Sequence, residues 1–169
     1  LRACPASHRF LARALHKRGQ ARRKRMTGEI NMQAQTKILV VDDNEVVRLS
    51  LLRSLRNASR SVQLADSAAE AVRLLEQERF DVVLLDLRMP GMDGLSFLKI
   101  LKQRWPECEA IVITGYPTIE TAVEALRLGA FNYLAKPVGP DEIVSAANDA
   151  TIQKQWTLRR EPRMQAAHA

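Results

Sequence analysis

The sequence predicts an α/β fold in which five parallel strands alternate with five helices in a three-layer sandwich. Short, strongly apolar runs recur along the chain, as at residues 38–41 (ILVV) and 82–85 (VVLL), and such runs are typical of strands buried on both faces. Between these runs lie longer segments whose apolar residues recur at helical spacing. The short connections between the two kinds of segment favour right-handed βαβ units, with helices on both faces of one sheet.

The boundaries of the elements follow from polar and helix-breaking residues. Asn44 can cap the first helix, because its side chain accepts hydrogen bonds from the free N–H groups there. Pro106 prevents the third helix from continuing, and Pro162 is expected to end the last helix by Arg160. Gly129 suits the end of the fourth helix. In chain order, the strands and helices alternate at residues 37–42, 44–59, 61–65 (a weak edge strand), 67–78, 80–86, 93–104, 109–114, 118–128, 131–135 and 140–156.

Each helix has an apolar face that we expect to contact the sheet. These faces give the sandwich its core, because a helix stripe of about 100° must be covered by another layer. The residues expected to point inward are Ala68, Ala71, Val72 and Leu75 in the second helix and Ile119, Ala122, Val123 and Leu126 in the fourth. In the first helix Val47, Leu51, Leu52 and Leu55 share one face, and in the third the apolar residues are Leu95, Leu98 and Leu101.

Charge separates an N-terminal arm from the rest of the chain, and the end of the last predicted helix separates a C-terminal tail. Residues 1–36 carry nine Lys or Arg and one acidic residue, a net charge of +8, whereas residues 37–169 sum to −1. We therefore expect a basic, mostly disordered arm at residues 1–36, a folded domain at 37–156 and a short tail at 157–169. The chain begins with Leu1, so a mis-assigned upstream start is an alternative explanation for the arm. Because the basicity belongs to the arm, the near-neutral domain does not suggest a nucleic-acid surface.

Cysteine usage and hydropathy bear on the compartment. Cys4 and Cys108 show no metal-ligand or redox spacing, so we expect two free thiols in a reducing compartment. The apolar runs are far shorter than the roughly 20 residues that span a bilayer. These observations predict a soluble, cytoplasmic protein without a membrane partner.

Five polar residues stand where apolar runs end. Asp42 and Asp43 follow the first strand, Asp86 the third, Thr114 ends the fourth, and Lys136 follows the fifth. The carboxyl ends of parallel strands line one edge of a sheet, where ligands bind. Taken singly, each residue also suits a helix cap, a turn or a solvated loop. Their joint occurrence in this order predicts phosphoryl chemistry on an aspartate, with Mg²⁺ as the metal that hard carboxylate ligands bind.

Two stretches of sequence carry a resemblance to a known family. The first is residues 86–94 (DLRMPGMDG). The second runs from residues 114–116 (TGY) through residues 136–138 (KPV). With these stretches, residues 36 to about 155 resemble a receiver domain of two-component response regulators. The sequence of these stretches is most similar to that of receivers in nitrogen-regulatory-type transcriptional regulators. The resemblance implies a flavodoxin-like sheet of order 2-1-3-4-5, which places the first and third strands side by side.

The resemblance also implies a function in a phosphorelay. Asp86 would take a phosphoryl group from a sensor histidine kinase or a histidine phosphotransfer protein. Mg²⁺ would be bound by Asp42, Asp43, Asp86 and the backbone carbonyl of Arg88. The chain would catalyse only its own phosphorylation and slow dephosphorylation, and would not be an enzyme in any other sense.

Three further residues have implied roles in reading the phosphate. Lys136 would bind a phosphoryl oxygen, and its bond to Pro137 is a candidate cis peptide, since cis bonds are costly except before proline. Thr114 would donate its hydroxyl to another phosphoryl oxygen. Tyr133 resembles the switch aromatic of the family. The output surface would comprise the fourth helix, fifth strand and fifth helix, and would bind a downstream protein or a second copy of the chain.

The residues that flank the approach of water have implied roles as well. In the family these positions lie two residues after the acceptor and two after the threonine, here Arg88 and Tyr116. Both side chains are large, and neither offers a carboxylate or amide that would orient a water molecule. We therefore expect slow loss of the phosphoryl group.

Two other functions are alternatives. A hydrolase of the haloacid dehalogenase class uses similar residues, but there the nucleophile comes first and the acidic pair last, the reverse of the order here. A DNA-binding transcriptional regulator needs an output domain, and only 13 residues follow Trp156. This second alternative therefore requires the chain to be a fragment that has lost its output domain.

Overall fold

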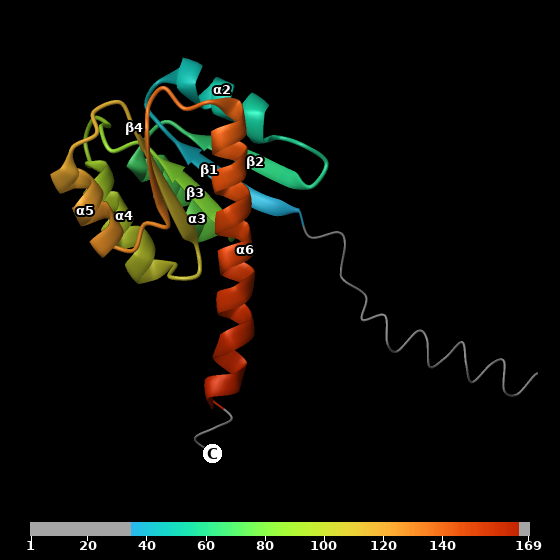
Figure 1. The fold of residues 1–169 in the computed structure, drawn as a ribbon. Helices are drawn as coiled ribbons and strands as arrows, with labels where there is room; N and C mark the ends of the chain where they lie inside the picture. Colours follow the sequence, from blue (N-terminus) through green and yellow to red (C-terminus); the bar gives the residue numbers. More distant parts are fainter. Residues whose placement is uncertain (1–34, 166–169) are drawn as a thin grey trace, which may run out of the picture. The chain divides into compact units, whose positions relative to one another are not determined.

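The computed structural model describes residues 35–165, with side chains described as far as Leu158. Most of the predicted N-terminal arm therefore lies outside the described residues. Within them, five parallel strands form one sheet of order β2-β1-β3-β4-β5 (Figure 1). This confirms the predicted fold class and strand order. In chain order the elements are β1 (Thr36–Val41), α2 (Glu45–Leu55), β2 (Arg60–Ala65), α3 (Ala68–Gln77), β3 (Val82–Leu85), α4 (Gly94–Arg104), β4 (Glu109–Thr114), α5 (Ile119–Arg127), β5 (Asn132–Ala135) and α6 (Pro140–Gln165).

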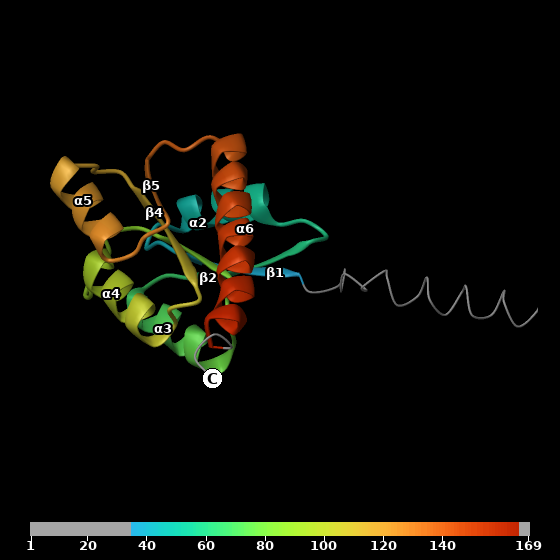
Figure 2. The ribbon, with the colours of Figure 1, turned by 60° about the horizontal axis from the view of Figure 1, so that its bottom comes forward.

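The sheet is covered on both faces, so residues 38–41 of β1 and all of β3 are buried. Successive side chains of a strand point to opposite faces. Leu39 and Val41 therefore lie in the cluster that contacts α3, α4 and α5, whereas Ile38 and Val40 lie in the cluster that contacts α2 and α6. Figure 2 shows the two groups of helices on opposite sides of the sheet. The burial explains why these strands read as unbroken apolar runs.

Helix caps place the ends of the helices beside the strand ends. Asn44 caps α2 by accepting hydrogen bonds from the N–H groups of Val46 and Val47, as predicted. Asp93 caps α4 through the N–H of Ser96. These caps satisfy N–H groups that have no partner within the helix. They also fix the loops that follow β1 and β3.

The expectation for the apolar face of α5 was wrong. Ile119, Val123 and Leu126 are 80%, 41% and 54% exposed, whereas Ala125 is fully buried. The helix lies against the core through its alanine side, where small side chains let it approach closely. Its larger apolar residues are on the opposite side. Amphipathic spacing identified the helix correctly but did not say which face contacts the sheet.

The expected end of the last helix was also wrong. α6 continues through Pro162 to Gln165. A proline inside a helix removes one backbone hydrogen bond and can kink a helix without ending it. The inner residues Ile143, Ala147 and Ala150 contact the sheet, but Trp156 and Leu158 are 58% and 48% exposed. Within residues 35–165, no helix has the length and apolar character needed to cross a membrane.

Candidate functional site

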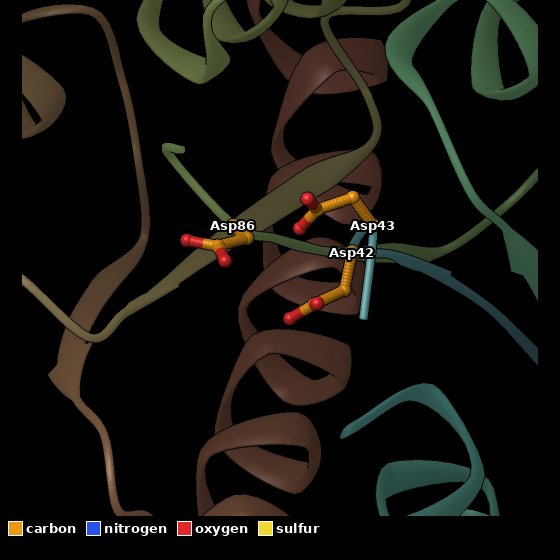
Figure 3. A group of neighbouring side chains, drawn as sticks. All are labelled: Asp42, Asp43 and Asp86. Carbon is orange, nitrogen blue, oxygen red and sulfur yellow. The ribbon is translucent and has the colours of Figure 1, made fainter. Parts of the chain in front are cut away.

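Three carboxylates meet at the carboxyl edge of the sheet. Asp42 directly follows β1 and Asp86 directly follows β3, and these strands are paired with Val41 opposite Leu85. Asp42, Asp43 and Asp86 each present an oxygen that lies within 4.8 Å of the other two (Figure 3). Asp42 and Asp86 are 2% and 8% exposed, whereas Asp43 faces solvent. Parallel pairing therefore brings together two segments that lie more than forty residues apart in sequence.

Lys136 bridges two of these carboxylates. Its Nζ lies 2.5 Å from Asp42 Oδ2 and 2.8 Å from Asp86 Oδ2. The bond between Lys136 and Pro137 is cis, as the sequence suggested. The N–H of Lys136 donates to the carbonyl of Thr114 at 2.8 Å, which ties the end of β5 to the end of β4. The sequence placed Lys136 at this edge, and the structure adds that it contacts both carboxylates at once.

The charges explain the pKa of Lys136. Burial favours the neutral amine and on its own would lower this pKa, but the hydrogen bonds that the ammonium donates to Asp42 and Asp86, together with the charges of these carboxylates, outweigh it, so the pKa is raised. Two like charges about 4 Å apart repel by about 4 kcal/mol at an effective dielectric of 20. The ammonium therefore offsets repulsion within the carboxylate cluster.

Backbone N–H groups complete the surroundings of the two buried carboxylates. The N–H of Asn44 donates to Asp42 Oδ1 at 2.9 Å, and the N–H of Arg88 donates to Asp86 Oδ1 at 3.2 Å. Each carboxylate thus accepts one hydrogen bond from the residue two positions later. These turns help to hold both side chains in the carboxylate cluster.

Thr114 is joined to Lys136 through its carbonyl, but neither its hydroxyl nor that of Tyr133 bonds to a carboxylate of this cluster. Thr114 is fully buried, and its Oγ1 accepts a hydrogen bond from the N–H of Tyr116 at 3.3 Å. Tyr133 OH shares a hydrogen bond of 2.7 Å with Thr121 Oγ1. Thr121 in turn forms the capping box of α5 with Thr118. Tyr133 is therefore connected to the N-terminus of α5, a contact that sequence reasoning missed because no pattern signals such a side-chain pair.

Arg88 and Tyr116, expected to flank the site, contact one another. The guanidinium of Arg88 lies over the ring of Tyr116, 4.0 Å from its centroid. Arg88 lies two residues after Asp86, on the loop that follows β3, and Tyr116 lies two residues after Thr114, on the loop that follows β4. The two loops are thereby linked beside Asp86 and Thr114.

Sequence reasoning missed the packing role of Gly94. A Cβ at this position would lie 2.5 Å from the carbonyl oxygen of Asp86 and 2.5 Å from the Cα of Leu87. Real Cβ atoms do not approach backbone so closely, so α4 begins against the loop that carries Asp86 only because residue 94 is glycine. The sequence has glycines at positions 91 and 94, and no local pattern shows which of them lies close to Asp86.

The donor set fits a hard divalent cation. Three carboxylates offer oxygen ligands, and Mg²⁺ prefers a few such ligands together with water and phosphate oxygens. Asp43 is exposed and faces solvent, so one of the three candidate ligands is accessible from outside. Cys108, by contrast, is buried, and burial raises the pKa of its thiol to about 12, which makes it a poor ligand and nucleophile.

Comparison with known protein families gives a match across most of the described domain. The family model for the response regulator receiver domain matches residues 38–148. That range includes the three carboxylates, Thr114 and Lys136.

Relatives of known sequence include bacterial response regulators and transcriptional regulators. The DNA-binding transcriptional regulator NtrC of Escherichia coli (strain K12) is 41% identical over 118 residues, which cover 70% of this chain and 25% of that protein. A putative response regulator NtrX-like protein of Rickettsia felis is 35% identical over 113 residues, covering 66% of this chain and 24% of the relative. The chain thus spans about a quarter of the length of these curated relatives.

Solved structures share the fold. A response regulator receiver domain protein (CheY-like) from Methanospirillum hungatei JF-1 is similar with a TM-score of 0.70 and 28% identity, covering 73% of this chain and 98% of that chain. NtrX from Brucella abortus, crystallised with ADP, is similar with a TM-score of 0.70 and 31% identity, covering 76% of this chain and 29% of that chain.

Proposed function

Because this chain belongs to the response regulator receiver domain family, we propose that it accepts a phosphoryl group on Asp86 from a phosphohistidine. The observation that carries the proposal is the position of Lys136, whose ammonium contacts Asp42 and Asp86 at 2.5 and 2.8 Å. A half-buried cation held between two carboxylates at the ends of adjacent strands is not explained by packing of the apolar core. It is suited to neutralise charge when an anionic phosphoryl group arrives.

In the proposed reaction, a carboxylate oxygen of Asp86 forms a bond to phosphorus as the P–N bond of the donor breaks. The electron pair of that bond remains on the imidazole nitrogen of the donor. Phosphoryl transfer depends mainly on positioning and charge stabilisation, so fixed groups around Asp86 supply most of the effect. The N–H of Arg88 and the ammonium of Lys136 already orient this carboxylate.

Asp42, Asp43, Asp86 and the backbone carbonyl of Arg88 would hold Mg²⁺. When bound, the ion supplies positive charge that neutralises both the clustered carboxylates and the phosphoryl oxygens. Lys136 binds a phosphoryl oxygen as a point charge once Asp86 is modified. Thr114 would turn its hydroxyl from the N–H of Tyr116 toward another phosphoryl oxygen.

The proposed output lies on α5, β5 and α6. Thr114 and Tyr133 connect the phosphoryl site to this surface as a two-state element. The hydrogen bond between Tyr133 and Thr121 supports the connection, because it joins the aromatic residue to the helix that would move. The exposed residues Ile119, Val123 and Leu126 give α5 an apolar face for a downstream protein or a second copy.

The proposed input is a sensor histidine kinase or a histidine phosphotransfer protein. Either would present its phosphohistidine at the carboxyl edge of the sheet, where Asp43 is exposed.

A second candidate is that the chain is part of a longer transcriptional regulator. The similarity to NtrC favours it, because that relative is described as DNA-binding and is matched over only 25% of its length. The coding sequence on both sides of this chain tests the point. An adjoining output domain in frame would support the candidate, and flanking genes for unrelated proteins would speak against it.

Acetyl phosphate, a small phosphoryl donor, tests the proposed acceptor chemistry. Incubation with Mg²⁺ should add one phosphoryl group to the full chain, as measured by intact mass. Omission of Mg²⁺ should abolish the gain. Turnover of a simple phosphoester without accumulation of modified protein would instead indicate a hydrolase.

A further inference from the structure

We propose that Arg48 is a positioning residue for the metal site, which orients the peptide that joins Asp42 to Asp43. Its Nη1 lies 2.6 Å from the carbonyl oxygen of Asp42. Arg48 lies in the first turn of α2 and is half-buried, and its own N–H donates to the carbonyl of Asn44 at 3.0 Å. This inference rests on the proposed function, because it concerns the residues that would hold Mg²⁺.

The two acidic residues are restrained differently. The carboxylate of Asp42 accepts hydrogen bonds from Lys136 and from the N–H of Asn44, and its own N–H donates to the carbonyl of Ala65 at 3.2 Å. Within residues 35–158, no hydrogen bond or ion pair restrains the carboxylate of Asp43. The direction of the Asp43 side chain therefore depends on its backbone.

Arg48 acts on that backbone. The carbonyl of Asp42 belongs to the same planar peptide as the N–H of Asp43, so a strong bond to this oxygen fixes the plane. A hydrogen bond from a charged guanidinium is roughly twice as strong as one between neutral groups. Arg48 thus anchors, from α2, the turn that presents Asp43.

The choice of acceptor leaves the carboxylate oxygens available. Lys136 contacts an oxygen of both Asp42 and Asp86, whereas Arg48 contacts only a neutral carbonyl. A positive charge so close to a cation site has two opposite effects. Repulsion alone would make metal binding weaker, while correct placement of Asp43 makes it tighter. The sign of the change on removal of Arg48 separates the two effects.

Binding of Mn²⁺, measured by its electron paramagnetic resonance signal, provides the test. Arg48→Met retains the aliphatic stem but removes the donor, and should weaken Mn²⁺ binding about tenfold, the usual cost of losing a group that orients a metal ligand. Arg48→Lys, which retains a charged donor with shorter reach, should recover part of this loss. Arg53→Met is the matched control, because Arg53 is exposed in the last turn of the same helix, and should bind Mn²⁺ like the wild type.

A second measurement excludes a purely structural role. The melting temperature of each variant is recorded without metal and with saturating Mn²⁺, and only the increase caused by the metal is compared. A smaller increase for Arg48→Met than for Arg53→Met supports positioning. Equal increases, or equal or tighter Mn²⁺ binding by Arg48→Met, would overturn the inference. If wild type and Asp43→Ala bind Mn²⁺ equally, the proposed metal site itself fails, which is a different outcome.

Discussion

The guanidinium of Arg88 stacks on the ring of Tyr116, with 4.0 Å between the guanidinium carbon and the ring centroid. The pair joins the loop after β3 to the loop after β4. Exposed cation–π contacts contribute about 0.5–1 kcal/mol, so this link is easily broken and re-formed. Its position beside Asp86 suits a cover over the proposed acyl phosphate rather than a contribution to stability.

We expect the phosphorylated protein to lose its phosphoryl group faster when this cover is removed. The double variant Arg88→Ala, Tyr116→Ala should open the path along which water attacks phosphorus. The decay of the modified species, followed by intact mass after removal of acetyl phosphate, gives the rate. Arg104→Ala is the control, because it removes a similar stack, on Trp105 at 4.6 Å, away from the site. Equal decay in all three proteins would show that the stacked pair does not guard Asp86.

Gly94 should tolerate no side chain. In Gly94→Ala the new methyl group would meet the backbone of Asp86 and Leu87 at 2.5 Å, so the loop or the start of α4 must shift. Overpacking of this kind costs about 1–3 kcal/mol. Gly115→Ala is the matched control, because its nearest neighbour would be Lys136 Cδ at an ordinary 4.0 Å. Urea unfolding compares the two variants, and a similar free energy of unfolding for both would contradict the geometry.

Lys136 should make the stability of the domain depend on alkaline pH. Its pKa is raised in the folded protein. Its ion pairs therefore stabilise the fold fully below the unfolded-state pKa of about 10.4, and this stabilisation is lost as pH rises through the folded-state value. Lys136→Met should be less stable than wild type by about 1–3 kcal/mol near neutral pH, since it leaves Asp42 and Asp86 without their cation.

The comparison of wild type with Lys136→Met separates the contribution of Lys136 from those of other titrating groups. Cys108, whose pKa is raised to about 12, also reduces stability above its ordinary pKa, but it does so in both proteins and cancels in the difference. Urea unfolding, at neutral pH and above a pH of about 10.4, measures the difference in the free energy of unfolding between wild type and Lys136→Met. This difference should become smaller at high pH, and a difference of constant size would refute the role given to the ion pairs.

The sequence predicted the sheet well because the signals are local. Unbroken apolar runs occur only where both faces of a strand are buried, and residues 38–41 of β1 and 82–85 of β3 meet that condition. The carboxylates were found for the same reason, since a polar residue that ends such a run must lie at the sheet edge. The cis bond before Pro137 was also predicted, because a cis peptide bond has a low energetic cost only before proline.

Other features depend on contacts between distant segments and leave no local signal. The spacing of Ile119, Val123 and Leu126 identifies α5 as amphipathic, but whether that face is covered depends on its neighbours. The guanidinium of Arg48 and the carbonyl of Asp42 are not a recognisable pattern in the sequence. The pairing of Thr121 with Tyr133 depends on how α5 lies beside β5.

The bond between Thr121 and Tyr133 should affect the environment of the tyrosine. Thr121→Val keeps the shape of the side chain but removes the hydroxyl. The chain has two tyrosines, so incorporation of fluorotyrosine gives one ¹⁹F signal for Tyr116 and one for Tyr133. We expect the signal of Tyr133 to move and that of Tyr116 to stay.

A control variant separates this effect from general helix changes. In Thr151→Val the lost hydroxyl is bonded only to the carbonyl of Ala147 within α6. Neither ¹⁹F signal should change in that protein. An unmoved Tyr133 signal in Thr121→Val would mean that the hydrogen bond does not restrain the aromatic ring.

The acceptor residue itself can be identified by chemical trapping. Borohydride reduces an acyl phosphate to an alcohol, which marks the modified aspartate in a peptide digest. After treatment of the full chain with acetyl phosphate and Mg²⁺, we predict reduction at Asp86 alone, with none in Asp86→Asn. Reduction at Asp42 or Asp43 in the wild type, or continued labelling of Asp86→Asn at the wild-type level, would contradict the central claim that Asp86 is the phosphoacceptor.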